Sequence, residues 1–93
     1  MREREIEKQF ALEVKRRGGI CPKLVAPGYD GMPDRLAFLP DGKLAFVEVK
    51  ASGQKPRPLQ LSRHRLLRSL GFPVYVLDDI EKIGGIIDEI QTT

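Results

Sequence analysis

The sequence is poor in the residues from which disulfides and zinc sites are built. Its 93 residues include one cysteine, one histidine and no tryptophan. A lone Cys21 excludes an intramolecular disulfide, and Cys21 together with His64 is too few for a zinc site of the Cys/His type. Any metal bound by this chain must therefore be held by oxygen atoms.

Long hydrophobic runs are missing as well. No apolar stretch approaches the ~20 residues needed to cross a bilayer, and the charged N-terminus lacks the hydrophobic segment of a secretory signal. We therefore expect a cytoplasmic protein. Because 93 residues are too few for two independent cores, residues 1–93 are expected to form a single domain.

Acidic residues are absent between Glu48 and Asp78, although the chain as a whole carries a net charge of only +3. The basic residues of this interval are Lys50, Lys55, Arg57, Arg63, Arg65 and Arg68. Such a run indicates a surface that faces phosphate groups, and hence a nucleic acid partner. The alternative is that these side chains only solvate one exposed helix face.

Hydrophobic periodicity and breaker residues predict seven elements in the order α-β-β-β-α-β-α. A helix over residues 3–17 ends at Gly18-Gly19, a short strand spans 20–25 despite Pro22, and 26–33 form a loop. Strands at 34–39 and 43–50, a helix at 59–70 and a buried parallel strand at 74–77 follow. The chain is therefore assigned to the α/β class, with a mixed β-sheet flanked by helices.

Two helices carry apolar stripes. Leu59, Leu66 and Leu70 are expected to share one side of the helix at 59–70. A last helix carries a stripe at the spacing i, i+3, i+4, i+7, made of Ile83, Ile86, Ile87 and Ile90. That stripe can cover either the chain's own sheet or a partner.

The loop Pro40-Asp41-Gly42 predicts the register of the first two long strands. A type I turn with a left-handed Gly42 gives a three-residue hairpin loop, in which paired positions sum to 82. The apolar pairs on one face are then Leu36 with Phe46 and Phe38 with Leu44. On the same face Asp34 falls opposite Glu48.

Two opposed carboxylates repel each other unless one takes up a proton or a cation lies between them. A divalent metal with hard oxygen ligands, such as Mg²⁺, suits this pair. Lys50 lies two residues beyond Glu48, on the same side of the strand, where its ammonium can orient a water or stabilise charge on a phosphate. The alternative is an ordinary strand end that reaches solvent.

Pro33-Asp34, followed after thirteen residues by Glu48-Val49-Lys50, resembles the PD-(D/E)xK nuclease signature. The wider pattern resembles the virus-type replication-repair nuclease (VRR-NUC) family over nearly the whole chain. Its most characteristic segments here are Gly31-Met32-Pro33-Asp34-Arg35, Phe46-Val47-Glu48-Val49-Lys50 and Pro56-Arg57-Pro58-Leu59-Gln60.

The resemblance implies a restriction-endonuclease-like core and cleavage of DNA phosphodiester bonds that depends on Mg²⁺ or Mn²⁺. It places the metal on Asp34, Glu48 and the carbonyl oxygen of Val49, with Lys50 beside the attacking water. It also implies roles for Gln60 and for one acid of the first helix. The similarity to related junction resolvases implies Glu7 as that acid, because it lies at the same distance before Gly18, with Glu3 as the alternative.

Two further residues, His64 and Tyr29, are given no catalytic role. His64, between Arg63 and Arg65, is expected on an exposed helix face. Tyr29 in the glycine- and proline-rich loop could stack on an unpaired base or anchor the loop.

The leading interpretation is a metal-dependent endonuclease acting in a bacterial or phage-infected host cell. We expect it to prefer branched DNA such as four-way (Holliday) junctions and to act as a homodimer. The surface predicted to bind DNA comprises Lys55, Arg57, Arg63, Arg65 and Arg68. The alternatives are a catalytically silent nucleic-acid-binding module on the same fold and a small domain that binds a partner through its isoleucine stripe.

Overall fold

The computed structural model describes residues 1–93 and contains one three-stranded sheet with three α-helices. The elements are α1 (Glu3–Arg16), β1 (Arg35–Leu39), β2 (Lys43–Val49), α2 (Pro58–Ser69), β3 (Val74–Leu77), the 3-10 turn η1 (Ile80–Lys82) and α3 (Ile83–Thr92). The strand order is β1-β2-β3; β1 runs antiparallel to β2, and β3 runs parallel to it. The predicted α/β class and mixed sheet are confirmed.

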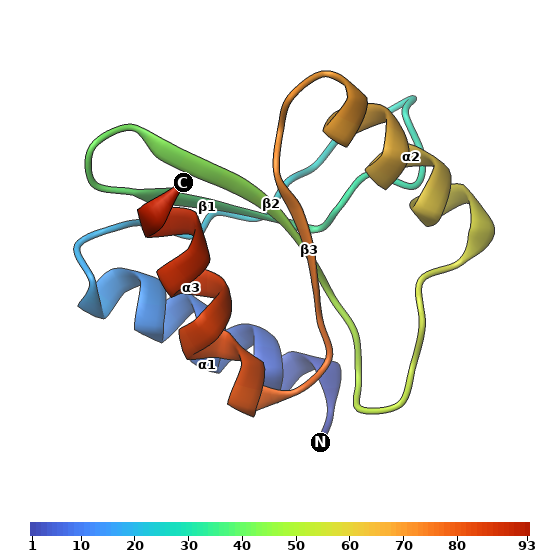
Figure 1. Cartoon of the computed structure of the whole chain (residues 1–93). Coiled ribbons are helices and arrows are strands. Elements are labelled where there is room, and N and C mark those ends of the chain that lie inside the picture. Colours follow the sequence, from blue (N-terminus) through green and yellow to red (C-terminus); the bar gives the residue numbers. More distant parts are fainter.

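The helices lie on both sides of the sheet. α1 and α3 pack side by side against one face, and α2 lies on the other side (Figure 1). This arrangement follows from the chain order, because joining the parallel strands β2 and β3 requires a long crossover connection, which here contains α2. No helix of the chain has both the length and the apolar character needed to cross a membrane.

The hydrophobic core lies between the sheet and the pair α1 and α3. α1 contributes Ile6, Phe10 and Val14, which recur every four residues and so share one face of the helix. The remaining buried residues of this cluster are Ala37, Leu39, Ala45, Val47, Val49, Leu77, Ile83, Ile87 and Ile90. The isoleucine stripe of α3 therefore covers the chain's own sheet, and the proposed partner-binding role of that stripe is wrong.

The hairpin register agrees with the prediction, but the deep core is on the opposite face from the predicted one. Leu36 pairs with Phe46 and Phe38 with Leu44, as expected. The fully buried strand residues are instead those that alternate with these pairs, such as Ala37, Ala45 and Val47, whereas Phe38 is 38% exposed. The reason is that two helices cover one face, whereas α2 covers only part of the other.

The turn between β1 and β2 differs in detail from the expected type I turn. Both Asp41 and Gly42 have positive φ, at 67° and 73°, and so Asp41 adopts the left-handed conformation together with the glycine. Aspartate tolerates this region because its short polar side chain can form local hydrogen bonds. The three-residue loop and the pairing of Leu39 with Lys43 are retained.

The strand predicted at residues 20–25 is reduced to two isolated bridges to β1. Ile20 pairs with Phe38 and Lys23 with Arg35, both antiparallel. Pro22 lies between them and has no N–H to donate, so a continuous ladder cannot form. Its carbonyl oxygen still accepts a hydrogen bond from Leu36 N at 3.0 Å, and the segment therefore covers the edge of β1.

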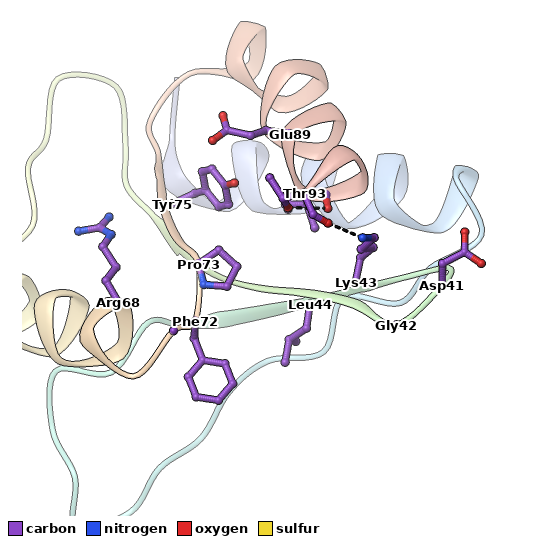
Figure 2. A pocket seen from close by; sticks show the side chains of 12 residues that line it. Asp41, Gly42, Lys43, Leu44, Arg68, Phe72, Pro73, Tyr75, Glu89 and Thr93 are labelled. Carbon is purple, nitrogen blue, oxygen red and sulfur yellow. Dashed lines mark hydrogen bonds between the residues drawn. The ribbon is translucent and has the colours of Figure 1, made fainter.

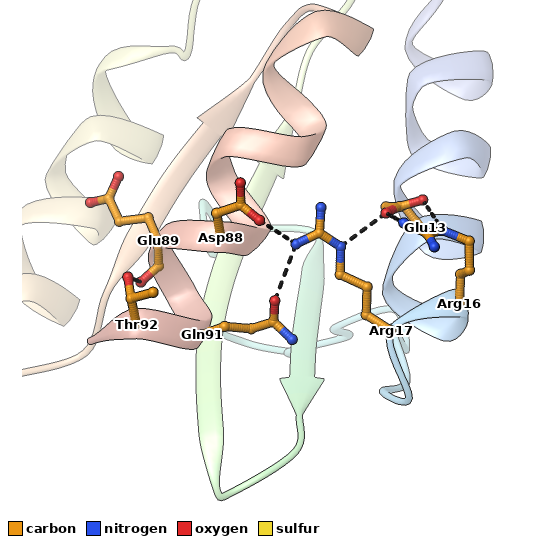
Figure 3. Close-up of polar contacts among 7 residues, drawn as sticks. All are labelled: Glu13, Arg16, Arg17, Asp88, Glu89, Gln91 and Thr92. Atoms are coloured by element: carbon orange, nitrogen blue, oxygen red, sulfur yellow. Dashed lines mark hydrogen bonds and ion pairs between the residues drawn. The ribbon is translucent and has the colours of Figure 1, made fainter.

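A partly buried guanidinium, that of Arg17, joins the C-terminal ends of α1 and α3. Arg17 donates to Glu13 at 2.9 Å, to Asp88 at 2.5 Å and to Gln91 at 3.1 Å (Figure 3). Hydrogen bonds from Arg16 and Arg17 lower the pKa of Glu13 to about 2. The Glu13 carboxylate therefore stays charged at a pH where an ordinary glutamate takes up a proton.

Candidate active site

Two carboxylates meet where β1 begins and β2 ends. Asp34 immediately precedes β1, and the register of the hairpin extends to place it opposite Glu48 of β2. Asp34 Oδ1 accepts a hydrogen bond from Val49 N at 3.0 Å, which ties it to the neighbouring strand. The Glu48 side chain is almost fully buried, on the side of the sheet that faces α2. The opposition predicted from the turn is therefore present in the fold.

Burial makes it costly for both carboxylates to be charged. Burial raises the pKa of Asp34 to about 6; the nearby charge of Glu48 adds to this, and the hydrogen bond from Val49 opposes it. Burial also raises the pKa of Glu48, whereas the charge of Lys50 lowers it. A cation between the two carboxylates would favour their charged forms, as the metal hypothesis requires.

The donor atoms at this position suit a hard divalent cation. Asp34 and Glu48 can offer carboxylate oxygens, and Val49, between Glu48 and Lys50, can offer its carbonyl oxygen. No cluster of three or more His, Cys, Asp or Glu side chains that could hold a metal occurs in the chain. Such a small protein donor set leaves coordination positions for water and phosphate oxygens, which is how Mg²⁺ is commonly bound.

Lys50 lies in the same site. Its Nζ is 3.8 Å from Glu48 Oε2, and its side chain is only 15% exposed. Its backbone N donates to Leu77 O at 2.8 Å, so the end of β2 is held against β3. The pairing of β2 with β3 therefore holds the part of the chain from which the Lys50 ammonium reaches Glu48.

Gln60 reaches the same carboxylate from α2. Pro58 starts this helix, which suits a proline because the first turn has no intrahelical use for its N–H. One turn in, Gln60 Nε2 donates to Glu48 Oε2 at 3.3 Å, while Gln60 Oε1 accepts from Arg57 N at 2.8 Å. Gln60, one of the candidate residues, thus connects the start of α2 to Glu48.

His64 is the contact that sequence reasoning missed. It was expected on an exposed helix face, but it is fully buried, with Nε2 3.2 Å from Glu48 Oε1. Burial lowers its pKa, and the charges of Arg68 and Lys50 act in the same direction. A ring with its proton on Nε2 can donate to Glu48, and Nδ1 has no hydrogen-bond partner.

The buried side of α2 is polar where it meets Glu48. Gln60, His64 and Leu67 are buried at the spacing i, i+4, i+7. The apolar stripe predicted for this helix is not its buried side, because Leu59, Leu66 and Leu70 are between 39% and 63% exposed. The four-residue spacing of Gln60 and His64 was the signal in the sequence that they share one side of the helix. Hydrophobicity alone could not show that this polar side is the buried one.

The acid of the first helix is already paired. Glu7 Oε1 accepts from Arg35 Nε at 2.7 Å, and Arg35 also donates to Cys21 O at 2.7 Å. The charge of Glu7 still contributes to the raised pKa of Asp34, and that of Glu3 contributes at both Asp34 and Glu48. Both candidate acids are therefore close enough to the carboxylate pair for their charges to affect it.

The basic residues predicted to bind DNA divide into two groups. Lys55, Arg57 and Arg65 are exposed and form no ion pair within the chain. Arg63 and Arg68 have structural contacts instead. Arg63 stacks 4.0 Å above the Tyr29 ring and donates to Asp30 O, and Arg68 donates to Val74 O at 2.8 Å. Tyr29 thus anchors its loop to α2.

The larger hollow of the molecule is remote from the carboxylates. It has a volume of about 640 Å³ and lies between the β1–β2 turn, the start of β3 and the end of α3 (Figure 2). Asp41, Lys43, Arg68 and Glu89 are among its lining residues, and none of the candidate site residues described above except Arg68 lines it. It therefore does not form part of the candidate site.

Known proteins resemble this chain in sequence and in structure. A protein of Acyrthosiphon pisum secondary endosymbiont phage 1, named "Putative nuclease p44", is 54% identical over 78 residues, which are 84% of each chain. A solved structure described as a VRR_NUC domain matches with a TM-score of 0.86 and 33% identity, over 92% of this chain and 94% of that one. No family model matches the chain.

Proposed function

This chain belongs to the VRR-NUC family, and from that premise we propose that it is a metal-dependent endonuclease that hydrolyses DNA phosphodiester bonds. The observation that carries the proposal is the arrangement of Asp34, Glu48 and Lys50. A buried carboxylate, Glu48, and a half-buried one, Asp34, both have raised pKa values and lie at the open end of a hairpin, and an ammonium lies 3.8 Å from Glu48. This arrangement suits a site that handles a metal ion and a phosphate.

In this proposal Asp34, Glu48 and the Val49 carbonyl hold Mg²⁺ or Mn²⁺. When bound, the ion supplies Lewis-acid stabilisation of the charge on the phosphate. The Lys50 ammonium orients the attacking water and stabilises the charge that develops as the water oxygen bonds to phosphorus and the P–O bond to the leaving sugar oxygen breaks. The attacking water gives up a proton to solvent, and the leaving sugar oxygen takes one up from solvent. Gln60 and His64 orient Glu48 by donating to its two oxygens.

A silent nucleic-acid-binding module on the same fold remains the alternative. It would bind DNA without cutting it. The presence of Asp34, Glu48 and Lys50 together favours the enzyme, because a module that only binds DNA has no use for two carboxylates beside a phosphate. The chemistry of the site therefore supports cleavage rather than binding alone.

We further propose that the enzyme acts as a homodimer on branched DNA. One site cuts one strand at a time, so resolution of a two-fold symmetric junction calls for two sites related by a two-fold axis. The isoleucine stripe is used inside the protein, and so the interface must lie elsewhere. The exposed apolar side chains of α2 and the turn after it, Leu66, Leu70 and Phe72, are candidates.

The proposal is tested by incubating the purified chain with a four-way junction and with a linear duplex of matched sequence, each with Mg²⁺, Mn²⁺ or EDTA. We expect cleavage with either metal, none with EDTA, and faster cleavage of the junction in two symmetric strands. Sedimentation at micromolar concentration should give a dimer. Cleavage in EDTA would overturn the metal requirement, and a monomer that cuts both substrates equally would overturn the junction and dimer proposals.

Removal of His64 is expected to lower the cleavage rate without touching the metal ligands. His64→Ala takes away one donor to Glu48 and should reduce the single-turnover rate about 10- to 100-fold, as loss of a group that orients a metal ligand commonly does. His64→Gln places an amide donor near the same oxygen and should recover part of the rate. A rate for His64→Ala equal to that of the unmodified protein would contradict the orienting role.

This experiment needs a stability control, because His64 is buried. Leu67→Ala truncates the next buried residue of α2, which provides no hydrogen bond to Glu48. Thermal unfolding should show a destabilisation in both variants. The cleavage rate, measured well below either unfolding midpoint, should fall only for His64→Ala.

A further inference from the structure

A second hollow lies along the outer side of α1 and is strongly basic. Its volume is about 410 Å³, and five of its eight lining residues are basic, against one acid. The basic residues are Arg4, Lys8, Lys15, Lys23 and Arg35. The residues of the predicted DNA-binding surface, Lys55, Arg57, Arg63, Arg65 and Arg68, do not line this hollow.

The sequence of α1 gives the hollow a straight basic wall. Arg4, Lys8, Ala11 and Lys15 follow the spacing i, i+4, i+7, i+11, which places them on one face of the helix. At 1.5 Å per residue, Arg4 and Lys15 are about 16 Å apart along the axis. The small side chain of Ala11 leaves room between the lysines. Lys23, from the segment that covers the edge of β1, belongs to the opposite wall.

The charges of this hollow are not neutralised by the protein. Arg4, Lys8, Lys15 and Lys23 form no ion pair within the chain, and only Arg35 is paired, with Glu7. Arg16, the last residue of α1, and Arg17, directly after it, are both held by carboxylates (Figure 3). Unpaired cations gathered in a concave surface concentrate a positive potential that attracts a polyanion.

The hollow adjoins the candidate active site in sequence, although Asp34, Glu48 and Lys50 are not among its lining residues. Glu7 and Arg35 belong to its lining, and Arg35 is the residue directly after Asp34. The charge of Glu7 contributes to the raised pKa of Asp34. A strand held in the hollow would therefore lie beside Arg35, one residue from the first carboxylate.

We propose that this hollow, formed by α1 and the segment around Lys23, binds the phosphate backbone of duplex DNA and leads it to Asp34. The length fits, because about 16 Å of α1 corresponds to four or five nucleotide steps at 3.4 Å of axial rise per step. The inference deepens the proposed function and depends on it for the choice of DNA as the ligand. It places the principal phosphate contacts on α1 rather than on the arginines of α2.

The test measures binding in EDTA, so that cleavage cannot interfere. Fluorescence anisotropy of a labelled duplex is recorded against salt concentration for the unmodified chain and for the double variant Lys8→Gln/Lys15→Gln. Each phosphate contact contributes about 0.9 to the magnitude of the slope of log affinity against log salt. The slope of the double variant should therefore be smaller in magnitude by about 1.8. Lys23→Gln should lose about 0.9 by the same reasoning.

The matched control removes two lysines outside the hollow. Lys43 contacts a backbone oxygen of Thr93, and Lys82 pairs with Asp78 at 2.7 Å. Lys43→Gln/Lys82→Gln changes the net charge by the same amount and should leave the slope unchanged. Equal losses in the two double variants would mean that only net charge matters, and this would overturn the hollow as the binding surface.

The remaining outcomes separate this inference from the proposed function. If the salt dependence of binding is unchanged in Lys8→Gln/Lys15→Gln and DNA is still cut in Mn²⁺, the hollow is not the DNA-binding surface. The proposed nuclease activity is unaffected by that result. If the slope falls in the double variant but the unmodified chain cuts no DNA with any metal, the nuclease proposal is wrong. The hollow is then still supported as the DNA-binding surface. Absence of DNA binding at low salt overturns the hollow.

Discussion

Asp34→Asn and Glu48→Gln are each expected to reduce DNA cleavage by about a thousandfold. Both substitutions keep the shape of the side chain but remove one of the two carboxylate charges that would hold the metal. The stabilisation that a catalytic metal provides is worth several kcal/mol, and each 1.4 kcal/mol is a factor of ten in rate. Single-turnover nicking of a supercoiled plasmid in Mg²⁺ and in Mn²⁺ measures the loss directly.

The control for this experiment separates catalysis from folding and binding. Asp30→Asn changes an exposed aspartate in the nearby loop whose carboxylate forms no ion pair, and it should cut at the normal rate. DNA binding in EDTA should survive in both site variants, because it depends on basic residues elsewhere. Full activity of Asp34→Asn or Glu48→Gln in Mg²⁺ would show that the site has been assigned to the wrong residues.

Lys50→Ala is expected to lower the rate at saturating metal by about 10²- to 10³-fold, the usual cost of removing one group that stabilises charge developing in the transition state. The side chain lies 3.8 Å from Glu48 Oε2 and does not replace an oxygen ligand. The concentration of Mn²⁺ that gives half of the maximal rate should therefore change little. Titration of Mn²⁺ in single-turnover assays yields both quantities from one set of measurements.

Lys82→Ala provides the matched lysine variant, since Lys82 is exposed and pairs only with Asp78. It should cut DNA at the normal rate over the whole titration. The role proposed for Lys50 would be contradicted if Lys50→Ala regained the normal rate once enough Mn²⁺ was added. That result would mean that the lysine affects metal binding alone.

The arrangement of the hairpin could be derived from local sequence because a short turn determines strand register. Pro40-Asp41-Gly42 permits only a three-residue loop between the flanking strands, and the pairing of Leu36 with Phe46 follows from that length. The opposition of Asp34 and Glu48 is a consequence of the same register. The residues of the α3 stripe were identified for a similar reason, since helical spacing depends only on neighbours along the chain.

The predicted strand at residues 20–25 marks a limit of that local reasoning. Its apolar residues suit a strand, but pairing also needs a donor at each alternate position, and Pro22 lacks one. Whether the segment paired at all depended on an edge of β1 being free to receive it. Two isolated bridges are the result.

Local pattern established the α/β class, the hairpin, the position of each helix and the two carboxylates with Lys50, since each depends on residues close in sequence. Tertiary packing decided which faces became buried. α1 and α3 together cover one face of the sheet, so the deep core formed there, and α2 turned its Gln60 and His64 side toward Glu48. A buried carboxylate needs hydrogen-bond donors, and these outweighed the exposed leucines of the same helix. The contact between His64 and Glu48, sixteen residues apart, therefore arises only when the helix crosses the finished sheet.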